Sequence, residues 1–182
     1  MAHSEYKLPD HLVILSTSDL QGNILSYNTG FRDASGYSDA ELKGKPHSIL
    51  RHPDMPKEAF QDLWQTLKNG HPWFGIVKNK RKNGDFYWVA ANASPIVHNG
   101  QVTGYVSVRY PASPDQIAFA DRLYTDLRAG RAKMPWTEVK TGKAFVLSMS
   151  SLSVLAPIAL IIQSIQTNSI GMLSIGLISA IA

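Results

Sequence analysis

The hydrophobic and polar positions of this chain follow two different periods, and the change between them predicts its elements. Alternation of apolar and polar or small side chains is typical of strands. The predicted strands are residues 12–17, 24–27, 73–81, 86–96 and 102–110. The last three are joined by Asn83-Gly84 and Asn99-Gly100, dipeptides that are preferred in tight hairpins. The pattern therefore predicts one hairpin, a central region and three further antiparallel strands.

The central region changes to a helical pattern. Residues 31–35 and 39–42 suit short helices, and Ser38 with Glu41 forms a capping-box pattern. Residues 56–69 are the clearest helix, because they begin with proline, carry apolar side chains on one stripe and are followed by glycine. Strands, then short helices, then a longer helix and three more strands indicate an α+β domain.

The two ends of the chain differ from this middle. Residues 1–11 are polar and are expected to form a poorly ordered lead-in, without the apolar core of a signal peptide. Residues 113–143 are expected to connect the domain to the C-terminal tail, with an amphipathic helix at residues 115–128. Residues 144–182 contain no charged side chain.

The uncharged tail predicts a membrane segment. Residues 144–162 would extend about 28 Å as a helix, close to the thickness of the hydrocarbon layer. A polar interruption comes at residues 163–169, and residues 170–182 would extend only about 20 Å, too short to cross. One span with a ragged end and a truncated hairpin both fit, and the alternative is a buried helix of a soluble domain.

The charge distribution supports the membrane interpretation. Through Leu127 the chain carries 13 basic and 13 acidic residues, whereas residues 128–143 carry five basic residues and one acidic residue. The net charge of +4 is therefore a basic collar before the apolar tail. Because basic residues stay on the cytoplasmic side, the domain is expected to be cytoplasmic and attached to a membrane. Nucleic-acid binding is not expected, since it needs basic residues spread over a folded face.

Several kinds of chemistry are excluded or not indicated by the residue types. The chain has no cysteine, which removes disulfides, thiolate metal sites, covalent haem attachment and cysteinyl–flavin photochemistry. No pair of carboxylates and no nucleophile with a base has a spacing that indicates catalysis. The chain is therefore expected not to be an enzyme.

One polar block narrows the interpretation further. Its sequence is Arg51-His52-Pro53-Asp54-Met55-Pro56, preceded by Gly36-Tyr37 and followed by Asn83-Gly84. In this order the motifs resemble the flavin-binding PAS domains of the bacterial aerotaxis receptor family, from about residue 12 to residue 109 and on into the membrane segment. The resemblance implies a PAS fold at residues 12–112, with a five-stranded antiparallel sheet and flanking helices, plus a C-terminal transmembrane segment at residues 144–182.

The strand pattern itself selects one candidate ligand-binding residue. Alternation places Trp73, Val77 and Asn79 on one face of their strand and three lysines, including Lys78, on the other, which is therefore expected to face solvent. An inward asparagine needs polar partners, and the edge of a flavin ring offers both donors and acceptors. The alternative is that backbone groups near the turn satisfy Asn79.

The resemblance implies further contacts with FAD, held noncovalently. The block is associated with FAD binding in that family: Arg51 would bind phosphate oxygens, His52 would contact the ring and Asp54 would hold one of them in place. The alternative is that Asp54 caps the following helix and pairs with Arg51. Arg109 would lie beside the redox-active part of the ring, or in solvent at the end of its strand. Asn28, Trp64 and Trp73 complete the candidate set.

The resemblance implies a cytoplasmic redox or oxygen (energy) sensor of aerotaxis that turns over no substrate. Its partners would be the inner membrane, a second copy of the chain, and a chemotaxis signalling domain in the same chain or a separate signalling protein. The alternatives are a cofactor-free PAS interaction module and a haem-binding one, with His47 or His52 as axial ligand. The family continues beyond the apolar run in which this sequence stops, so the chain is either a fragment or a short relative.

Overall fold

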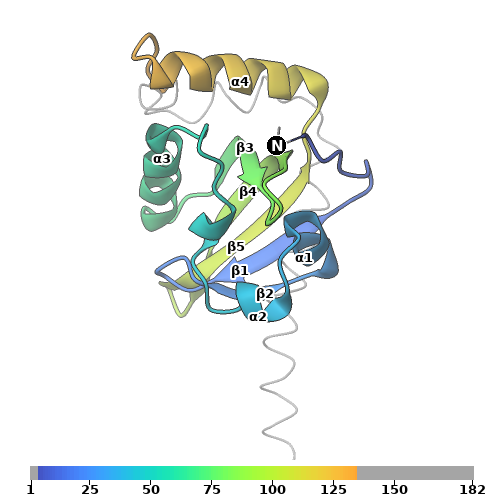
Figure 1. Ribbon diagram of the computed structural model, residues 1–182. Helices are drawn as coiled ribbons and strands as arrows, with labels where there is room; N and C mark the ends of the chain where they lie inside the picture. The colour runs from blue at the N-terminus through green and yellow to red at the C-terminus, as the bar shows by residue number, and fades with distance from the viewer. Residues whose placement is uncertain (1–3, 135–182) are drawn as a thin grey trace, which may run out of the picture. The chain divides into compact units, whose positions relative to one another are not determined.

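A computed structural model describes residues 4–134, which form a five-stranded antiparallel sheet with helices on both faces (Figure 1). The order across the sheet is β2-β1-β5-β4-β3, so β2 and β3 are the edge strands. The strands are β1 (Ile14–Ser18), β2 (Ile24–Tyr27), β3 (Trp73–Lys80), β4 (Phe86–His98) and β5 (Gln101–Pro111). All five predicted strands are confirmed, with boundaries that differ by a few residues.

The turn between β4 and β5 confirms the hairpin expected there. Asn99 and Gly100 have φ angles of 50° and 76°, so both adopt the left-handed region. This conformation, which asparagine and glycine tolerate best, matches the twist of the two strands. The paired strands run in register from His98 and Gln101 back to Val89 and Pro111, with one irregularity at Ile96.

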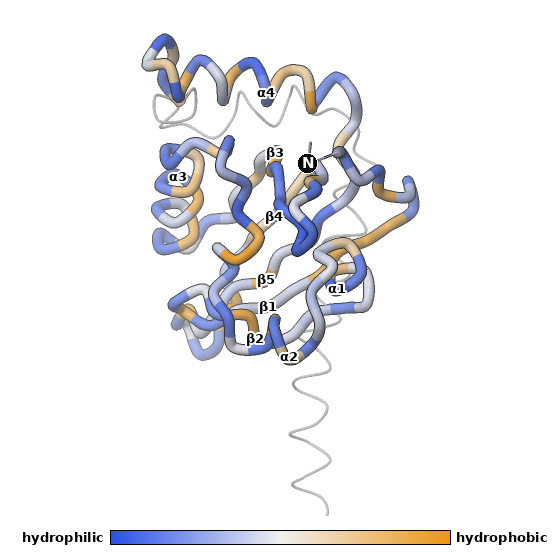
Figure 2. The backbone as a smooth tube through the Cα atoms, viewed as in Figure 1, coloured by the Kyte–Doolittle hydropathy of each residue, from blue (hydrophilic) through white to orange (hydrophobic). Residues whose placement is uncertain are grey.

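The helices also occur in the predicted order. They are α1 (Thr29–Ser35), α2 (Asp39–Leu42), the 3₁₀ turn η1 (His47–Leu50), α3 (Lys57–Lys68) and α4 (Pro114–Arg128). Ser38 and Glu41 form the predicted capping box at the start of α2. Pro56 is the N-cap of α3, whereas the sequence predicted it as the first helical residue. In Figure 2 the hydrophobic residues of α3 lie on the side that faces the sheet.

The sheet separates two layers. Its inner face is covered by α1, η1 and α3, whereas α4 lies on the outer face of β3 and β4. There the Tyr124 ring stacks on Trp88 with centroids 6.5 Å apart, and its hydroxyl donates to the carbonyl of Ile76. This arrangement overturns one expectation. Lys78 is only 8 % exposed, because the predicted solvent face of β3 is covered by α4.

The N-terminal lead-in is ordered from residue 4, so the prediction of a poorly ordered segment is wrong for residues 4–11. The amide of Tyr6 donates to the carbonyl of Phe86 at 2.7 Å, and the amide of Ser4 donates to the Asp85 carboxylate at 3.0 Å. The Arg81 guanidinium lies 3.7 Å from the centre of the Tyr6 ring. These contacts fix the segment beside the turn between β3 and β4.

The predicted membrane segment, residues 144–182, and the basic collar after residue 134 lie outside the described residues. Within residues 4–134 no helix is both long and apolar enough to cross a membrane. The last strand, β5, ends at Pro111, and α4 begins at Pro114.

Asn28 joins the sheet to the first helix. Its amide donates to the carbonyl of Val13 at 2.7 Å, and its side-chain oxygen accepts from the amides of Leu15 and Phe31, each at 3.0 Å. The bond from Phe31 caps α1. The polar capacity of this side chain is thus used within the backbone of the domain.

We expect Asn28→Ala to lower the free energy of unfolding by about 1–3 kcal/mol, because backbone groups of β1 and α1 lose their partner. Urea unfolding of the purified protein measures the change. Asn69→Ala, at the exposed C-terminus of α3, is the control and should stay within about 0.5 kcal/mol of wild type. Equal stability of the two variants would contradict this role of Asn28.

Candidate functional site

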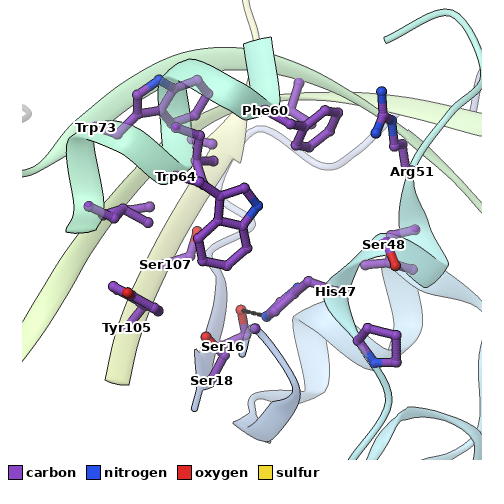
Figure 3. A pocket seen from close by; sticks show the side chains of 18 of the residues that line it. Ser16, Ser18, His47, Ser48, Arg51, Phe60, Trp64, Trp73, Tyr105 and Ser107 are labelled. Carbon is purple, nitrogen blue, oxygen red and sulfur yellow. Dashed lines mark hydrogen bonds between the residues drawn. The ribbon is translucent and has the colours of Figure 1, made fainter. Parts of the chain in front are cut away.

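A cavity of about 300 Å³ lies between the inner face of the sheet and the helical layer. One wall consists of side chains from β1, β3, β4 and β5, and the other of η1, residue 51 and α3. Its size is at the lower end of the range for small-molecule sites. Small residues on the sheet, Ala91 and Ala93, allow a flat group to approach the strand closely. Figure 3 shows the cavity with ten of its lining residues labelled.

Two tryptophans bound the cavity. The Trp64 indole meets the Tyr105 ring edge to face with centroids 5.5 Å apart, and a side chain at Gly22 would lie only 2.8 Å from the indole. Glycine in the β1–β2 turn thus makes room for Trp64. The indole nitrogen of Trp73 donates to the Asp62 carboxylate at 2.7 Å, which ties β3 to α3. Trp73 therefore offers a ligand its apolar ring and not its nitrogen.

Asn79 lines the cavity and is only 7 % exposed. Its backbone pairs with that of Arg51 in an isolated bridge, but its side-chain amide has no hydrogen-bond partner among residues 4–134. A buried amide without a partner costs about 1–3 kcal/mol. The alternative that backbone groups near the turn satisfy this side chain is therefore wrong. The amide is available to a ligand.

Arg109 is the second polar group of the cavity. Its guanidinium donates to the Ser16 hydroxyl at 3.2 Å and lies 5.5 Å from the centre of the Phe31 ring. Burial lowers the pKa of Arg109, although an arginine remains charged under any ordinary condition. In the described part of the chain no carboxylate pairs with it. Arg109 is thus not a solvent-exposed strand end, but a partly buried cation that lines the cavity.

His47 is the third group, and it shares the Ser16 hydroxyl with Arg109. Its Nε2 atom lies 3.3 Å from Ser16 Oγ (Figure 3). Its ring meets Phe31 edge to face at 5.7 Å. Burial, and secondly the charge of Arg109, lower the pKa of His47 to about 3. The imidazole is therefore neutral at physiological pH, which leaves Arg109 as the nearby positive charge.

Arg51 stands at the opening of the cavity. Its guanidinium lies 4.3 Å from the centre of the Phe60 ring and donates to the carbonyl of Met55 at 3.3 Å. It also lines a groove on the outer side of α3, together with Lys57 and Lys68. Phe60 and Trp64 line both spaces. The cavity and this groove, which has three basic side chains, thus lie on either side of shared lining residues.

The structure places three of the predicted site residues elsewhere. Asn28 caps α1 and binds the backbone of β1. His52 lies against the Phe86 ring, edge to face at 5.5 Å, on the outer face of the sheet. The Asp54 carboxylate accepts from Lys78 Nζ at 2.6 Å, and this amine lowers the pKa of Asp54. Asp54 Oδ2 also lies 3.5 Å from His52 Nδ1, so the expectation that Asp54 holds a neighbour in the block is met for His52, whereas the alternative of a helix cap is wrong because Pro56 is the N-cap of α3.

The cavity unites Arg51, Trp64, Trp73, Asn79 and Arg109, five of the eight predicted residues. The sequence patterns did not indicate the polar cluster around Ser16, and they indicated His47 only as a candidate haem ligand. The signal for Ser16 is its position in β1 opposite Ser107 of β5, two residues before Arg109. That pairing is set by the tertiary structure, so a single strand pattern does not show it.

Taken together, the site can hold a flat aromatic group with polar atoms on its edge and negative charge near Arg109. Asn79 can both donate and accept, Arg109 supplies positive charge, and the small alanines supply a close apolar surface. A flavin ring has these properties, and its phosphate tail matches the basic groove. In residues 4–134 no group of three or more histidine, aspartate or glutamate side chains is placed to hold a metal ion.

Comparison with known proteins agrees with the fold. Residues 24–109 match the family model described as the PAS fold. The aerotaxis receptor of Escherichia coli (strain K12) is 54 % identical over 124 residues, which is 68 % of this chain and 24 % of the receptor. The nitrogen fixation regulatory protein of Klebsiella oxytoca is 32 % identical over 98 residues, 53 % of this chain and 20 % of that protein. The chain therefore spans about a quarter or less of the length of these relatives.

Solved structures share the architecture at low identity. A PAS domain of a protein from Colwellia psychrerythraea has a TM-score of 0.51 at 24 % identity, covering 56 % of this chain and 86 % of that one. A light-oxygen-voltage domain studied with a flavin analogue has a TM-score of 0.54 at 21 % identity, covering 64 % and 87 %. These similarities establish the fold alone.

The buried His47 predicts a pH dependence of stability. Its pKa is lower in the folded state than in the unfolded chain, so the unfolded chain binds the extra proton first. The contribution of the neutral ring is complete above about pH 6.5 and is lost as the pH falls toward about 3. Within that window the free energy of unfolding should fall by up to about 1.4 kcal/mol per pH unit from this group.

We expect His47→Gln to flatten this dependence between about pH 6 and about pH 4, measured by urea unfolding at several pH values. His98→Gln, in the exposed end of β4, is the matched control and should keep the wild-type slope. A slope that is the same in wild type and in both variants would mean that His47 takes up its proton without cost in the folded protein.

Proposed function

The chain belongs to the PAS fold family through residues 24–109 and is similar to an aerotaxis receptor over that domain, and we propose that it is a redox or energy sensor that binds FAD noncovalently. The observation that carries the proposal is a pair of polar groups in one cavity: among the described residues the Asn79 amide has no hydrogen-bond partner, and the Arg109 guanidinium has no carboxylate partner. A flavin in this cavity supplies reversible uptake of electrons. The residues supply binding, orientation and charge.

The ring is expected to bind against β4, with its polar edge toward Asn79. The closeness of Ala91 and Ala93 supports this orientation, because larger side chains at these positions would fill the space. Asn79 gains the hydrogen bonds that the described domain does not give it, so binding removes the cost of an unsatisfied buried amide.

The groove outside the cavity supports a dinucleotide rather than a mononucleotide. Arg51, Lys57 and Lys68 line this groove, which shares Arg51 and Phe60 with the lining of the cavity. A pyrophosphate leaving the cavity would pass the planar fork of Arg51, which suits phosphate oxygens. The two lysines add positive charge along the path of the tail.

Arg109 and His47 determine how the site responds to negative charge. Arg109 already lies in the cavity as a cation, so added electron density beside it is stabilised in a region of low dielectric. His47 is neutral and bonded to the same serine, and negative charge beside it would raise its pKa and so favour uptake of a proton. The residues thus favour binding of a more negative ligand.

We also propose that the domain is cytoplasmic and anchored in the bacterial inner membrane through residues 144–162. The support is the sequence: no net charge through Leu127, +4 from residue 128 to residue 143, and no charge beyond. Signalling in aerotaxis would then pass to a chemotaxis signalling domain or a separate protein, with a second copy of the chain as a further partner. The aerotaxis receptor supports this part of the proposal by similarity only.

The purified protein should show the visible absorption of an oxidised flavin, which dithionite bleaches. Arg51→Ala and Asn79→Ala should each weaken FAD binding roughly tenfold to a hundredfold, because each removes a polar contact in a largely buried site. His98→Ala, on the exposed end of β4, should bind as wild type does. Absorbance after gel filtration and titration of the flavin-free protein with FAD measure these changes.

A colourless protein that does not take up FAD would refute the cofactor and leave a cofactor-free interaction module. A Soret band would instead indicate haem, with His47 as the candidate ligand in the cavity. Equal flavin content in all three variants at equal stability would assign Arg51 and Asn79 a structural role.

For the membrane proposal, Leu155→Arg should reduce retention in the membrane fraction, since a charge at the centre of a spanning helix costs about 2.5–3.5 kcal/mol. Leu25→Arg is the matched control, because Leu25 is 53 % exposed on β2, and it should leave retention unchanged. Truncation after Lys143 should release a soluble, flavin-loaded domain. Wild-type protein in the soluble fraction, or protease access to residues 128–143 from the periplasm, would refute the topology.

A further inference from the structure

The predicted FAD-binding block wraps around the edge of the sheet and reaches both faces. We call residues 51–55 the edge segment. Its first residue pairs by backbone with Asn79 of the edge strand β3, and its last residue accepts a hydrogen bond at Sδ from the amide of Lys78 at 3.3 Å. Because Asn79 and Lys78 are neighbours in a strand, their side chains point to opposite faces. The edge segment therefore contacts the cavity side and the α4 side together.

On the cavity side the segment makes its contacts through Arg51. The guanidinium lines the cavity and also closes the segment on itself, by donating to the carbonyl of Met55 at 3.3 Å. The same group lies over the Phe60 ring of α3. An anionic group in the cavity would compete with the Met55 carbonyl for these N–H donors, because the fork has a fixed geometry.

On the α4 side the segment makes its contacts through Asp54. Its carboxylate accepts from Lys78 Nζ at 2.6 Å, and its backbone carbonyl accepts from the Arg128 guanidinium at the end of α4. Lys78 Nζ also lies 4.3 Å from the centre of the Phe86 ring and 5.6 Å from that of Trp88, on which Tyr124 of α4 stacks. The charged groups around Asp54 are thus Lys78 and Arg128, with His52 within the segment.

We propose that the edge segment transmits the state of the cavity to α4. When the charge near Arg51 changes, its bond to the Met55 carbonyl is made or released, and Asp54 moves with the segment. The bonds from Asp54 to Lys78 and Arg128 then weaken or tighten, which changes how firmly α4 is held on the sheet. The identity of the ligand rests on the proposed function, whereas the link between Arg51 and Asp54 does not.

Hydrogen exchange of the α4 amides in the full chain, loaded with FAD, tests the link. Reduction with dithionite should change α4 exchange roughly two- to fivefold, the effect of one partly exposed ion pair. Asp54→Asn and Arg128→Gln should abolish the change while flavin absorbance shows that FAD remains bound. Arg122→Gln, on the exposed side of the same helix, is the matched control and should keep the change. A full redox response in Asp54→Asn, or loss of FAD from it at equal folding, overturns the proposal.

A second measurement needs no flavin and so separates this link from the proposed function. In flavin-free protein, Arg51→Ala and Asp54→Asn should each speed α4 exchange roughly two- to fivefold. If Arg51 acts through Asp54, the double variant exchanges no faster than Asp54→Asn alone. Independent, multiplicative effects of the two substitutions, or no effect of Arg51→Ala, overturn the link. If the protein does not bind FAD but the effects of the two substitutions are non-additive, the cofactor is refuted and the link is supported.

Discussion

This site depends on one constraint, the positive charge of Arg109 beneath the sheet. Among the residues that the structure describes, no carboxylate neutralises this charge. Burying an unpaired charge is costly, and the domain meets part of the cost for Arg109 with the Ser16 hydroxyl and the face of Phe31. The neighbouring His47 stays neutral, because burial and, secondly, the charge of Arg109 lower its pKa. A negatively charged ligand in the cavity would therefore stabilise the domain.

The remaining features of the cavity are consistent with the same requirement. Asn79 is buried without a partner in the described domain, and two alanines on β4 leave space where larger side chains would close the core. Each of these lowers the stability of the domain alone, and the proposed binding of a polar-edged ring would compensate for each. Stability and ligand binding are therefore linked here, and the pH dependence through His47 belongs to the same linkage.

The sheet divides the domain into a binding layer and an outer layer that holds α4. Contacts that go around the edge of the sheet join these two layers. The edge segment is such a contact, because β3 is an edge strand of the described sheet and the segment pairs with the edge of β3 that faces away from β4. Covering the edge also removes exposed backbone donors and acceptors that would otherwise pair with other chains.

The order of the elements could be predicted from sequence alone, because alternation, helical stripes and asparagine–glycine turns are local properties. The sequence also placed Asn79 inward, since the period of a strand is two and Trp73 and Val77 share its face. It did not place Asp54 or Lys78, because which face of β3 is solvent depends on where α4 lies, more than thirty residues away in the chain. The partly buried position of Arg109 and its serine shared with His47 likewise arise only when β1, β5 and η1 meet. Such contacts are set by tertiary packing, and no local pattern contains them.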